Sequence, residues 1–328
     1  MKTLVEIDLS DVTRDAIGAE LLKITDYSDA DRTSASLYQA FALLPIDELQ
    51  AILDFGRHAD SAGVGVVRNL PVDPQLPLTP VDGNPSHDKQ SFVAEGVLLG
   101  LSSLLGVPIG FTTEKSGRLV HDVVPVEQGA MTQTNQGSVV FLNFHNDIVH
   151  DALGRYDLPN PDFLVLNCLR QDRGREAVTY YADARDVCSR LADEVVATLR
   201  KPLFQLNAPG SYVRDVAGGE PMYSEPIPII SGPDDAPEIT ISANGVRALT
   251  TAASKVFAVV QQACRDVAHE VKLEPGTAML INNRKGLHAR SPFAAKHDGT
   301  DRWLQRTYVR RDLWSIRYRK AAGSRRVH

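Results

Sequence analysis

The sequence predicts an α+β fold, a double-stranded β-helix (jelly-roll, cupin-like) core with flanking helices. Short runs of strand-forming residues fill most of the chain after residue 111, which favours a sandwich or barrel over a βαβ array. Helical patterns precede and interrupt these runs. Two strand-like runs each carry a histidine, His145 and His288, and a closed barrel would bring the two side chains together.

Composition restricts the class of protein. The 328 residues include 35 Lys+Arg and 41 Asp+Glu, a net charge of −6, which excludes a nucleic-acid binder held by bulk positive charge. Hydrophobic residues make up 43% of the chain and can form a sizeable core. Length alone suggests two domains of about 150 residues each, but a barrel exceeds that size as one unit. We expect a single domain over residues 1–328.

The cysteines and the N-terminal residues indicate in which cellular compartment the protein is expected. Cys168, Cys188 and Cys264 lie far apart without metal-ligand spacing, which suits a reducing cytoplasm. The first residues lack the apolar run of a signal peptide, and no stretch approaches the roughly 20 apolar residues that span a bilayer. The sequence therefore predicts a cytoplasmic protein with no membrane or nucleic-acid partner.

Residues 1–110 mix helix and strand and are expected to pack on the barrel. Residues 45–56 have helical apolar spacing, with proline at the start and glycine near the end. Residues 63–70 are predicted to form a buried strand, residues 71–85 a loop, and residues 88–105 a second helix.

After residue 111, strands and two helices alternate. Strands are predicted over 118–126, 138–145, 162–168, 178–181, 238–242, 277–282 and 303–310, and helices over 184–199 and 248–271. Residues 207–237 are too rich in proline and glycine for regular structure, so they form either a lid over a site or an ordinary surface loop. The basic end, residues 317–328, is expected to be a solvated tail.

The first candidate for chemistry is the pair His145 and Asp147. Alternate residues of a strand share a face, so these two side chains lie about 7 Å apart on one side. Alone, the pair is weak evidence for metal binding, because a histidine and an aspartate two residues apart are common and usually form a surface or hydrogen-bonded pair. His288 follows the apolar strand near residue 280, and two imidazoles with one carboxylate form the facial ligand set of non-haem Fe(II) oxygenases.

A second candidate is the strand that begins near residue 301. Its alternation places Arg302, Leu304, Arg306 and Tyr308 on one face, with the two arginines roughly 13 Å apart at their backbones. Arginines inside a barrel need anionic partners, and two carboxylate-bearing ligands would supply them. In the opposite orientation, residues 303, 305 and 307 face inward and both arginines are solvated. Spacing alone favours neither orientation.

Five motifs resemble one enzyme family. They span residues 114–125 (EKSGRLVHDVVP), 144–147 (FHND), 161–170 (PDFLVLNCLR), 288–293 (HARSPF) and 298–306 (DGTDRWLQR). The chain resembles the clavaminate synthase-like branch of the Fe(II)/2-oxoglutarate-dependent oxygenases over about residues 63–313. Within that branch it is similar to hydroxylases that act on C3 of free asparagine or arginine.

The resemblance implies a role for eight residues. His145, Asp147 and His288 match the iron ligands, and Arg302 with Thr179 matches the site for 2-oxoglutarate. The remaining matches concern the substrate: Arg306 for its α-carboxylate, Glu114 for its α-ammonium group, and Gln136 for a further contact. The cofactors implied are Fe(II), 2-oxoglutarate as cosubstrate and O2.

Three departures from the family pattern concern the substrate. The acidic ligand is Asp147, where the family often has Glu, and the chain between Asn146 and Pro161 is several residues longer than expected. Relatives place an aspartate near the end of the lid to bind a polar or basic side chain, where this chain has Ser242 and Asn244. Neither can neutralise a guanidinium, so a ureido, amide or aliphatic side chain becomes the better candidate.

The resemblance implies C3 hydroxylation of a free L-α-amino acid in antibiotic or non-ribosomal peptide metabolism. Hydroxylation at C4, desaturation and cyclisation remain alternatives, as do a non-catalytic barrel that binds a small acid and a hydrolase with the same metal ligands. Halogenation is disfavoured because it needs an open position where Asp147 stands. Among other residues, His121 is expected to be a core or second-layer histidine, Cys168 a core residue, and His150 with Asp151 part of a surface loop.

Overall fold

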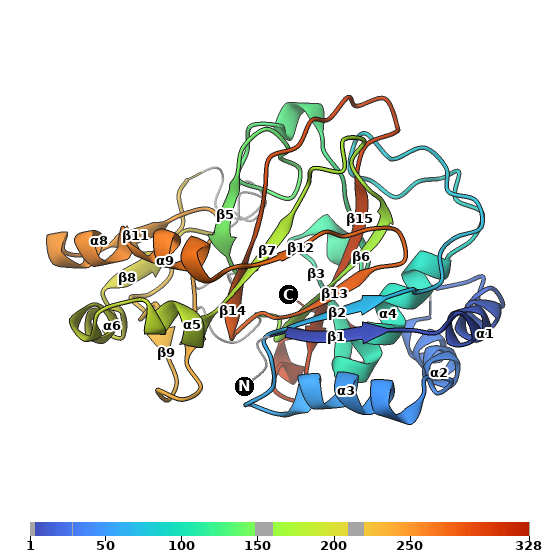
Figure 1. Cartoon of the computed structure of the whole chain (residues 1–328), viewed down its shortest axis with the longest axis horizontal. Helices are drawn as coiled ribbons and strands as arrows, with labels where there is room; N and C mark the ends of the chain where they lie inside the picture. Colours follow the sequence, from blue (N-terminus) through green and yellow to red (C-terminus); the bar gives the residue numbers. More distant parts are fainter. Residues whose placement is uncertain (1–3, 28, 148–159, 209–219, 328) are drawn as a thin grey trace.

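The computed structural model describes residues 4–27, 29–147, 160–208 and 220–327, and its main features are two β-sheets flanked by helices (Figure 1). The larger sheet has the strand order β1-β2-β13-β6-β15-β3-β16, with β4 also paired to β15, and the smaller has the order β12-β7-β14-β5. The strands of the larger sheet are β1 (Leu4–Asp8), β2 (Val64–Arg68), β3 (Val107–Phe111), β4 (His121–Val123), β6 (Phe163–Arg170), β13 (Ala278–Asn282), β15 (Trp303–Arg310) and β16 (Arg326–Val327). Those of the smaller are β5 (Leu142–His145), β7 (Thr179–Asp183), β12 (His269–Val271) and β14 (Gly286–Arg290).

Two short antiparallel strand pairs and two groups of α-helices accompany the sheets. The strand pairs are β8 (Phe204–Leu206) with β11 (Val246–Ala248), and β9 (Ile230–Ser231) with β10 (Glu238–Ile239). The helices are α1 (Asp11–Leu21), α2 (Ala30–Phe41), α3 (Ile46–Arg57), α4 (Val93–Leu105), α5 (Ala184–Ser189), α6 (Asp193–Leu199), α8 (Thr251–Phe257) and α9 (Val260–Val267). No helix within the described ranges combines the length and apolar character needed to span a bilayer.

The central strands separate two apolar cores. In β13, Ala278 and Leu280 join the core under the N-terminal helices, while Met279 and Ile281 join the core on the opposite face. The period-2 alternation of a strand produces this division, and β6 follows the same rule. Tyr181 of the smaller sheet lies in the second core, so the two sheets pack face to face.

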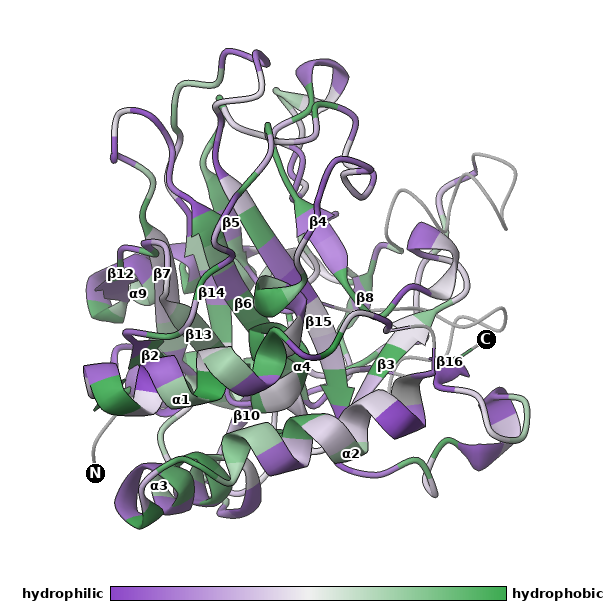
Figure 2. Ribbon diagram, turned by 90° about the vertical axis from the view of Figure 1, so that its right-hand side faces the viewer, coloured by the Kyte–Doolittle hydropathy of each residue, from purple (hydrophilic) through white to green (hydrophobic). Residues whose placement is uncertain are grey.

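Each helix group covers the outer face of one sheet. α4 lies directly on β6 and β15, with α2 and α3 packed outside it (Figure 2). Residues of α5, α6, α8 and α9 form a third core with Phe144, Ala182 and Leu287 of the smaller sheet. The mixture of sheets and flanking helices agrees with the α+β prediction.

Several predicted elements differ in extent. The helix expected over 88–105 begins at Val93, because the Asp73 carboxylate from the preceding loop accepts hydrogen bonds from the backbone N–H groups of Val93 and Ala94. The helix expected over 184–199 divides into α5 and α6, and Asp193 and Glu194 stand in the first turn of α6, as suits a helix N-terminus.

The prediction of one helix over residues 248–271 was also wrong. Thr250 caps α8, a second helix α9 follows, and His269–Val271 form β12, which pairs with β7. Pairing with a strand 90 residues away in sequence overrides the local helical pattern. Of residues 207–237, residues 209–219 lie outside the described ranges, and the remainder includes β9.

The C-terminal segment is not a solvated tail as predicted. Residues Arg326–Val327 form β16, which pairs in parallel with β3, and Val327 is fully buried. The apolar valine and the open edge of β3 explain why this basic segment docks rather than remaining in solvent.

Candidate active site

A cavity of about 670 Å³ lies where the two sheets face each other. Strands of both sheets line it: β5, β7 and β14 on one side, β6 and β15 on the other. All eight residues singled out from the sequence line this one cavity: Glu114, Gln136, His145, Asp147, Thr179, His288, Arg302 and Arg306.

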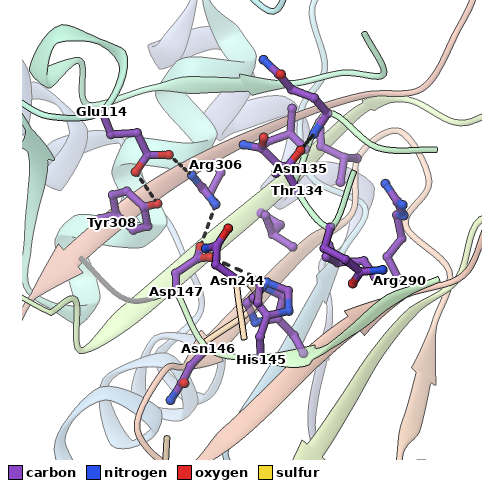
Figure 3. Close-up of a pocket in the computed structure, with 18 of the residues that line it drawn as sticks. Glu114, Thr134, Asn135, His145, Asn146, Asp147, Asn244, Arg290, Arg306 and Tyr308 are labelled. Atoms are coloured by element: carbon purple, nitrogen blue, oxygen red, sulfur yellow. Dashed lines mark hydrogen bonds and ion pairs between the residues drawn. The ribbon is translucent and has the colours of Figure 1, made fainter. Parts of the chain in front are cut away.

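The two histidines and the aspartate converge as predicted. β5 and β14 are antiparallel neighbours whose register pairs His145 with His288, and the imidazole centroids lie 4.3 Å apart. Asp147 follows β5 directly, and one potential ligand atom from each of the three side chains lies within 4.8 Å of the others (Figure 3). Two imidazoles and one carboxylate on one side of a metal are the donor set of an Fe(II) facial site.

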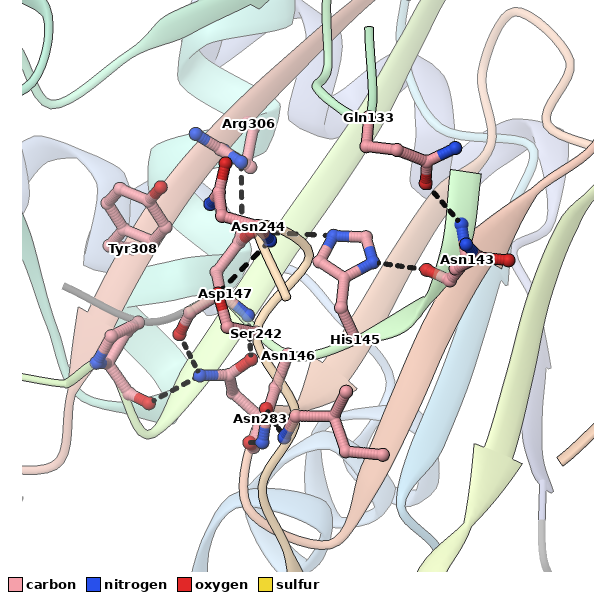
Figure 4. A network of polar contacts seen from close by, with 12 residues as sticks. Gln133, Asn143, His145, Asn146, Asp147, Ser242, Asn244, Asn283, Arg306 and Tyr308 are labelled. Atoms are coloured by element: carbon pink, nitrogen blue, oxygen red, sulfur yellow. Dashed lines mark hydrogen bonds and ion pairs between the residues drawn. The ribbon is translucent and has the colours of Figure 1, made fainter. Parts of the chain in front are cut away.

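The protonation states also suit a metal. The Nδ1–H of His145 donates to the carbonyl of Asn143 (2.7 Å), which leaves Nε2 unprotonated at 3.8 Å from Asp147 Oδ1 (Figure 4). Burial lowers the pKa of His145, and burial together with the neighbouring His145 and Arg306 lowers that of His288 well below its usual value. Neutral imidazoles are the form that binds metal ions, so the residues present fit a ferrous ion.

Two asparagines that the sequence reasoning did not single out hold Asp147 in place. Asn283 accepts a hydrogen bond from the Asp147 N–H (2.9 Å) and donates to the Asp147 carbonyl (2.7 Å). Asn146 donates to the carbonyls of Ile239 and Asn283 and accepts from the N–H of Ile241 (Figure 4). Buried side-chain amides here replace the backbone partners of a regular strand, and the only indication in the sequence was the position of Asn146 inside the motif of residues 144–147.

Arg302 is buried beside the histidines without a carboxylate partner. Only 5% of its surface is exposed, and no carboxylate of the described residues lies within ion-pair distance. Its Nη2 donates to Thr179 Oγ1 (3.2 Å), and its guanidinium lies 5.8 Å from the Phe293 ring centroid. Burial lowers the pKa of Arg302. A buried guanidinium in this state is costly unless a ligand supplies the anion.

Arg306 lies in a dense ionic cluster. It donates to Asp147 Oδ2 and to Glu114 Oε1, both at 2.7 Å, and the Tyr308 hydroxyl donates to Glu114 Oε2 at 2.8 Å (Figure 3). Burial acts to lower the pKa of Arg306, but the neighbouring Asp147, Tyr308 and Glu114 outweigh it and raise the pKa. Its Nε–H is buried without a partner among the described residues and points to a missing acceptor.

β15 takes the first of the two orientations that its spacing left open. Arg302, Leu304, Arg306 and Tyr308 all line the cavity, while Gln305 on the other face donates to Glu95 and Asp122. Both faces of the strand are buried, so neither set of side chains is solvated.

A loop over residues 129–141 carries Gln136 to the cavity wall. Arg290, two residues after His288, donates to the carbonyls of Gly137 and Val140 and thereby ties this loop to β14. Sequence reasoning missed this contact because an arginine that binds backbone carbonyls leaves no sequence pattern. Ser242 and Asn244 line the cavity, and among the lining residues within the described ranges the acidic side chains are Glu114 and Asp147.

The remaining candidates have structural positions. His121 is buried, with Nε2 at 3.0 Å from the Arg118 carbonyl and Nδ1 at 3.4 Å from Arg306, and burial lowers its pKa to about 4. Cys168 is a core residue whose thiol donates to the Leu273 carbonyl, and burial raises its pKa to about 12. His150, Asp151 and the longer segment of residues 148–159 lie outside the described residues.

Comparison with known proteins gives consistent matches. Residues 42–308 match the model of the taurine catabolism dioxygenase TauD, TfdA family. The chain is 33% identical to an L-asparagine oxygenase of Streptomyces coelicolor over 92% of this chain and 90% of the relative. It is 30% identical to an L-lysine 3-hydroxylase of Catenulispora acidiphila, over 88% and 78% of the two chains. A solved asparagine oxygenase, in complex with Fe(II), (2S,3S)-3-hydroxyasparagine and succinate, superposes with a TM-score of 0.86 at 30% identity over 98% of each chain.

Proposed function

Because the chain belongs to the taurine catabolism dioxygenase TauD, TfdA family, we propose that it is an Fe(II)- and 2-oxoglutarate-dependent oxygenase that hydroxylates a free L-α-amino acid at C3. The family resemblance expected from the motifs is confirmed. The observation that carries the function is buried Arg302, without a carboxylate partner among the described residues, beside the three converging metal-ligand side chains. This arrangement supports a dicarboxylic cosubstrate that binds the metal at one end and the arginine at the other.

We assign the roles as follows. His145, Asp147 and His288 hold the iron, and Arg302 with Thr179 holds the distal carboxylate of 2-oxoglutarate. When bound there, Fe(II) together with 2-oxoglutarate and O2 would supply the oxidising chemistry of C–H hydroxylation.

The protein selects the reacting bond by position. We propose that Arg306 binds the substrate α-carboxylate, Glu114 its α-ammonium group and Gln136 a further polar group. The unpartnered Arg306 Nε–H supports this assignment, since an incoming carboxylate would satisfy it. A clamp at both charged ends fixes Cα, so that C3 is the carbon held nearest the iron.

We also propose that the two facing sheets form a double-stranded β-helix and that residues 1–328 act as one domain. The cavity between the sheets, lined from both, supports this architecture. We propose that residues 207–237 act as a lid over the cavity, which is supported by Ser242 and Asn244, because these residues follow the segment closely and line the same space. The three unpaired cysteines are compatible with work in the cytoplasm. We assign the product to specialised metabolism, because ribosomal protein synthesis does not incorporate free C3-hydroxylated amino acids.

The test is anaerobic addition of Fe(II) and 2-oxoglutarate, followed by a panel of free L-amino acids in air. We expect a visible charge-transfer band, then amino-acid-dependent succinate release and a product that has gained one oxygen. His288→Ala should abolish both signals, whereas His58→Ala, an exposed histidine, should leave them unchanged. Absence of the band in the unmodified protein would refute the assignment, and loss of two hydrogens instead would indicate desaturation or cyclisation.

A further inference from the structure

The C-terminal strand is attached to the edge of the strand that leads into the substrate clamp. The Gly110 N–H donates to the Arg325 carbonyl (3.1 Å), and the Thr112 N–H donates to the Val327 carbonyl (2.9 Å). β3 ends at Phe111, and Glu114 follows three residues later. The final described residues of the chain are therefore hydrogen-bonded to the segment that carries the Glu114 carboxylate (Figure 2).

The turn that carries Glu114 has an unfavourable backbone. Lys115 and Ser116 have φ values of 49° and 57°, in the left-handed region that side-chain-bearing residues rarely adopt, and Gly117 continues with φ 74°. Such conformations persist only where the surroundings hold them, and they concentrate at functional sites. Within the turn, the Glu114 N–H donates to the Phe111 carbonyl and the Gly117 N–H to the Glu114 carbonyl, and from outside it the Lys115 ammonium donates to the Gly83 carbonyl at 2.8 Å. β16 adds backbone pairing to these contacts.

β16 covers this turn from outside. Side-chain carbons of Arg326 lie 3.1 Å from where a Cβ on Gly117 would stand, and a Cβ on Gly110 would stand 2.3 Å from the Gly117 carbonyl oxygen. β3, the turn and β16 are thus packed with no room for another side chain.

Val327 also packs in the apolar cluster that holds Tyr308, the tyrosine hydrogen-bonded to the Glu114 carboxylate. It is fully buried in the same apolar cluster as Phe111 and Tyr308, whose rings meet edge to face at 5.4 Å. The Tyr308 hydroxyl donates to Glu114 Oε2. Both the backbone of Glu114 and the tyrosine that orients its carboxylate therefore rest on a cluster that Val327 completes.

An ion pair also links the C-terminal segment to α2. Arg325 pairs with Asp31 of α2 at 2.8 Å, but the aspartate is exposed and such pairs contribute little. Strand pairing and Val327 burial are therefore the main attachments of the segment.

We propose that β16 is a positioning element for the substrate clamp: it holds the strained turn over residues 114–117 so that Glu114 can receive the substrate's ammonium group. This inference rests on the proposed function, in which Glu114 binds the amino acid and Arg302 binds 2-oxoglutarate. Arg302 stands just before β15, six residues from Tyr308 along the same cavity face, and its Nη2 donates to Thr179 of the smaller sheet rather than to Glu114 or Tyr308. Damage to β16 weakens amino-acid binding and spares 2-oxoglutarate binding.

The test compares Val327→Asp with Val12→Asp, which places the same charge on a valine that is 80% exposed in α1. We expect Val327→Asp to raise the KM for the amino acid at least about tenfold, while the Kd for 2-oxoglutarate, measured from the Fe(II) band, changes less than about twofold. Val327→Ile, which keeps an apolar side chain at this position, should retain the amino-acid KM of the unmodified protein, and so should Val12→Asp.

If Val327→Asp does not fold, Val327→Ala gives the decisive result, with a smaller rise in the same KM. Equal weakening of both ligands, or an unchanged amino-acid KM, would overturn the inference. A failure of the proposed function is distinct, because the unmodified protein would then lack the 2-oxoglutarate band or the response to amino acids.

Discussion

At the scale of single residues, all eight candidates line one cavity, and most of them could be recognised from the chemistry of their own motif. The pair His145 and Asp147, the later His288 and the alternation from Arg302 to Arg306 were all visible in the sequence. Thr179, Glu114 and Gln136 came from family resemblance alone. Asn146 and Asn283 were missed, since their function depends on carbonyls far away in sequence that only the fold brings near.

Arg302 offers the sharpest test at this scale. Arg302→Ala should weaken 2-oxoglutarate binding by about 10- to 100-fold, because a charge-assisted, two-pronged contact is lost from a buried site. Arg302→Lys should recover only part of the affinity, since an ammonium group lacks the planar fork. The measurement is anaerobic titration of the Fe(II) band with 2-oxoglutarate.

Arg68→Ala is the control, because Arg68 forms a half-exposed ion pair with Glu6 and is not among the residues that line the cavity. It should leave the titration unchanged. If Arg302→Ala kept normal 2-oxoglutarate affinity and lost amino-acid affinity instead, the two arginines would have to exchange roles.

At the scale of elements, local pattern predicted the existence of strands and helices better than their ends. The helix over residues 46–57 and the strands β2, β6, β13 and β15 have strong periodicity or β-rich composition and appear where expected. The start of α4 depends on Asp73, and β12 depends on β7, so partners remote in sequence decide both. No residue range was predicted for the strand that carries His288, because the five residues of β14, Gly286–Arg290, are too few to show a clear alternation.

Close packing of α4 gives a prediction that opposes helix propensity. Gly100→Ala should favour the helix intrinsically by about 1 kcal/mol. However, a Cβ there would stand 2.1 Å from the Phe41 ring of α2, and both residues are fully packed in the core under the larger sheet. We expect a net loss of about 1–3 kcal/mol in the free energy of unfolding.

Chemical denaturation checks this expectation. Gly18→Ala in α1 is the matched control, because its new Cβ would lie 3.3 Å from Pro71 Cβ and needs only a small adjustment. Its effect should stay within about 1 kcal/mol of zero. A stabilised Gly100→Ala protein would mean that α2 and α4 are packed less tightly than described.

At the scale of the whole molecule, the site exists because two sheets close on each other. His145 and His288 are separated by more than 140 residues in sequence, yet they are paired in register on adjacent strands. Periodicity gives the face on which each side chain lies, but not which strands become neighbours. That pairing could be expected only from the requirement that one metal needs all three ligands.

The charge of the whole cavity then restricts the substrate. Its lining includes four cationic side chains, Lys115, Arg290, Arg302 and Arg306, against two carboxylates, Glu114 and Asp147. The charges of a ferrous ion and of 2-oxoglutarate cancel, and so do those of the α-ammonium and α-carboxylate groups of the amino acid. Excess positive charge therefore remains on the described lining residues, and both of their carboxylates already pair with Arg306, so neither is free to receive a cationic side chain.

L-Citrulline and L-arginine test this argument, since they have nearly the same shape and differ in the charge of the side chain. We expect citrulline to support 2-oxoglutarate turnover with a KM at least about tenfold lower than that of arginine, because a guanidinium would be desolvated without an acidic partner. Asn244→Asp adds a carboxylate to the cavity wall, so it should narrow or invert the ratio of the two KM values, whereas Asn244→Ser should preserve that ratio. Arginine preference in the unmodified protein would show that a carboxylate outside the described lining residues reaches the cavity.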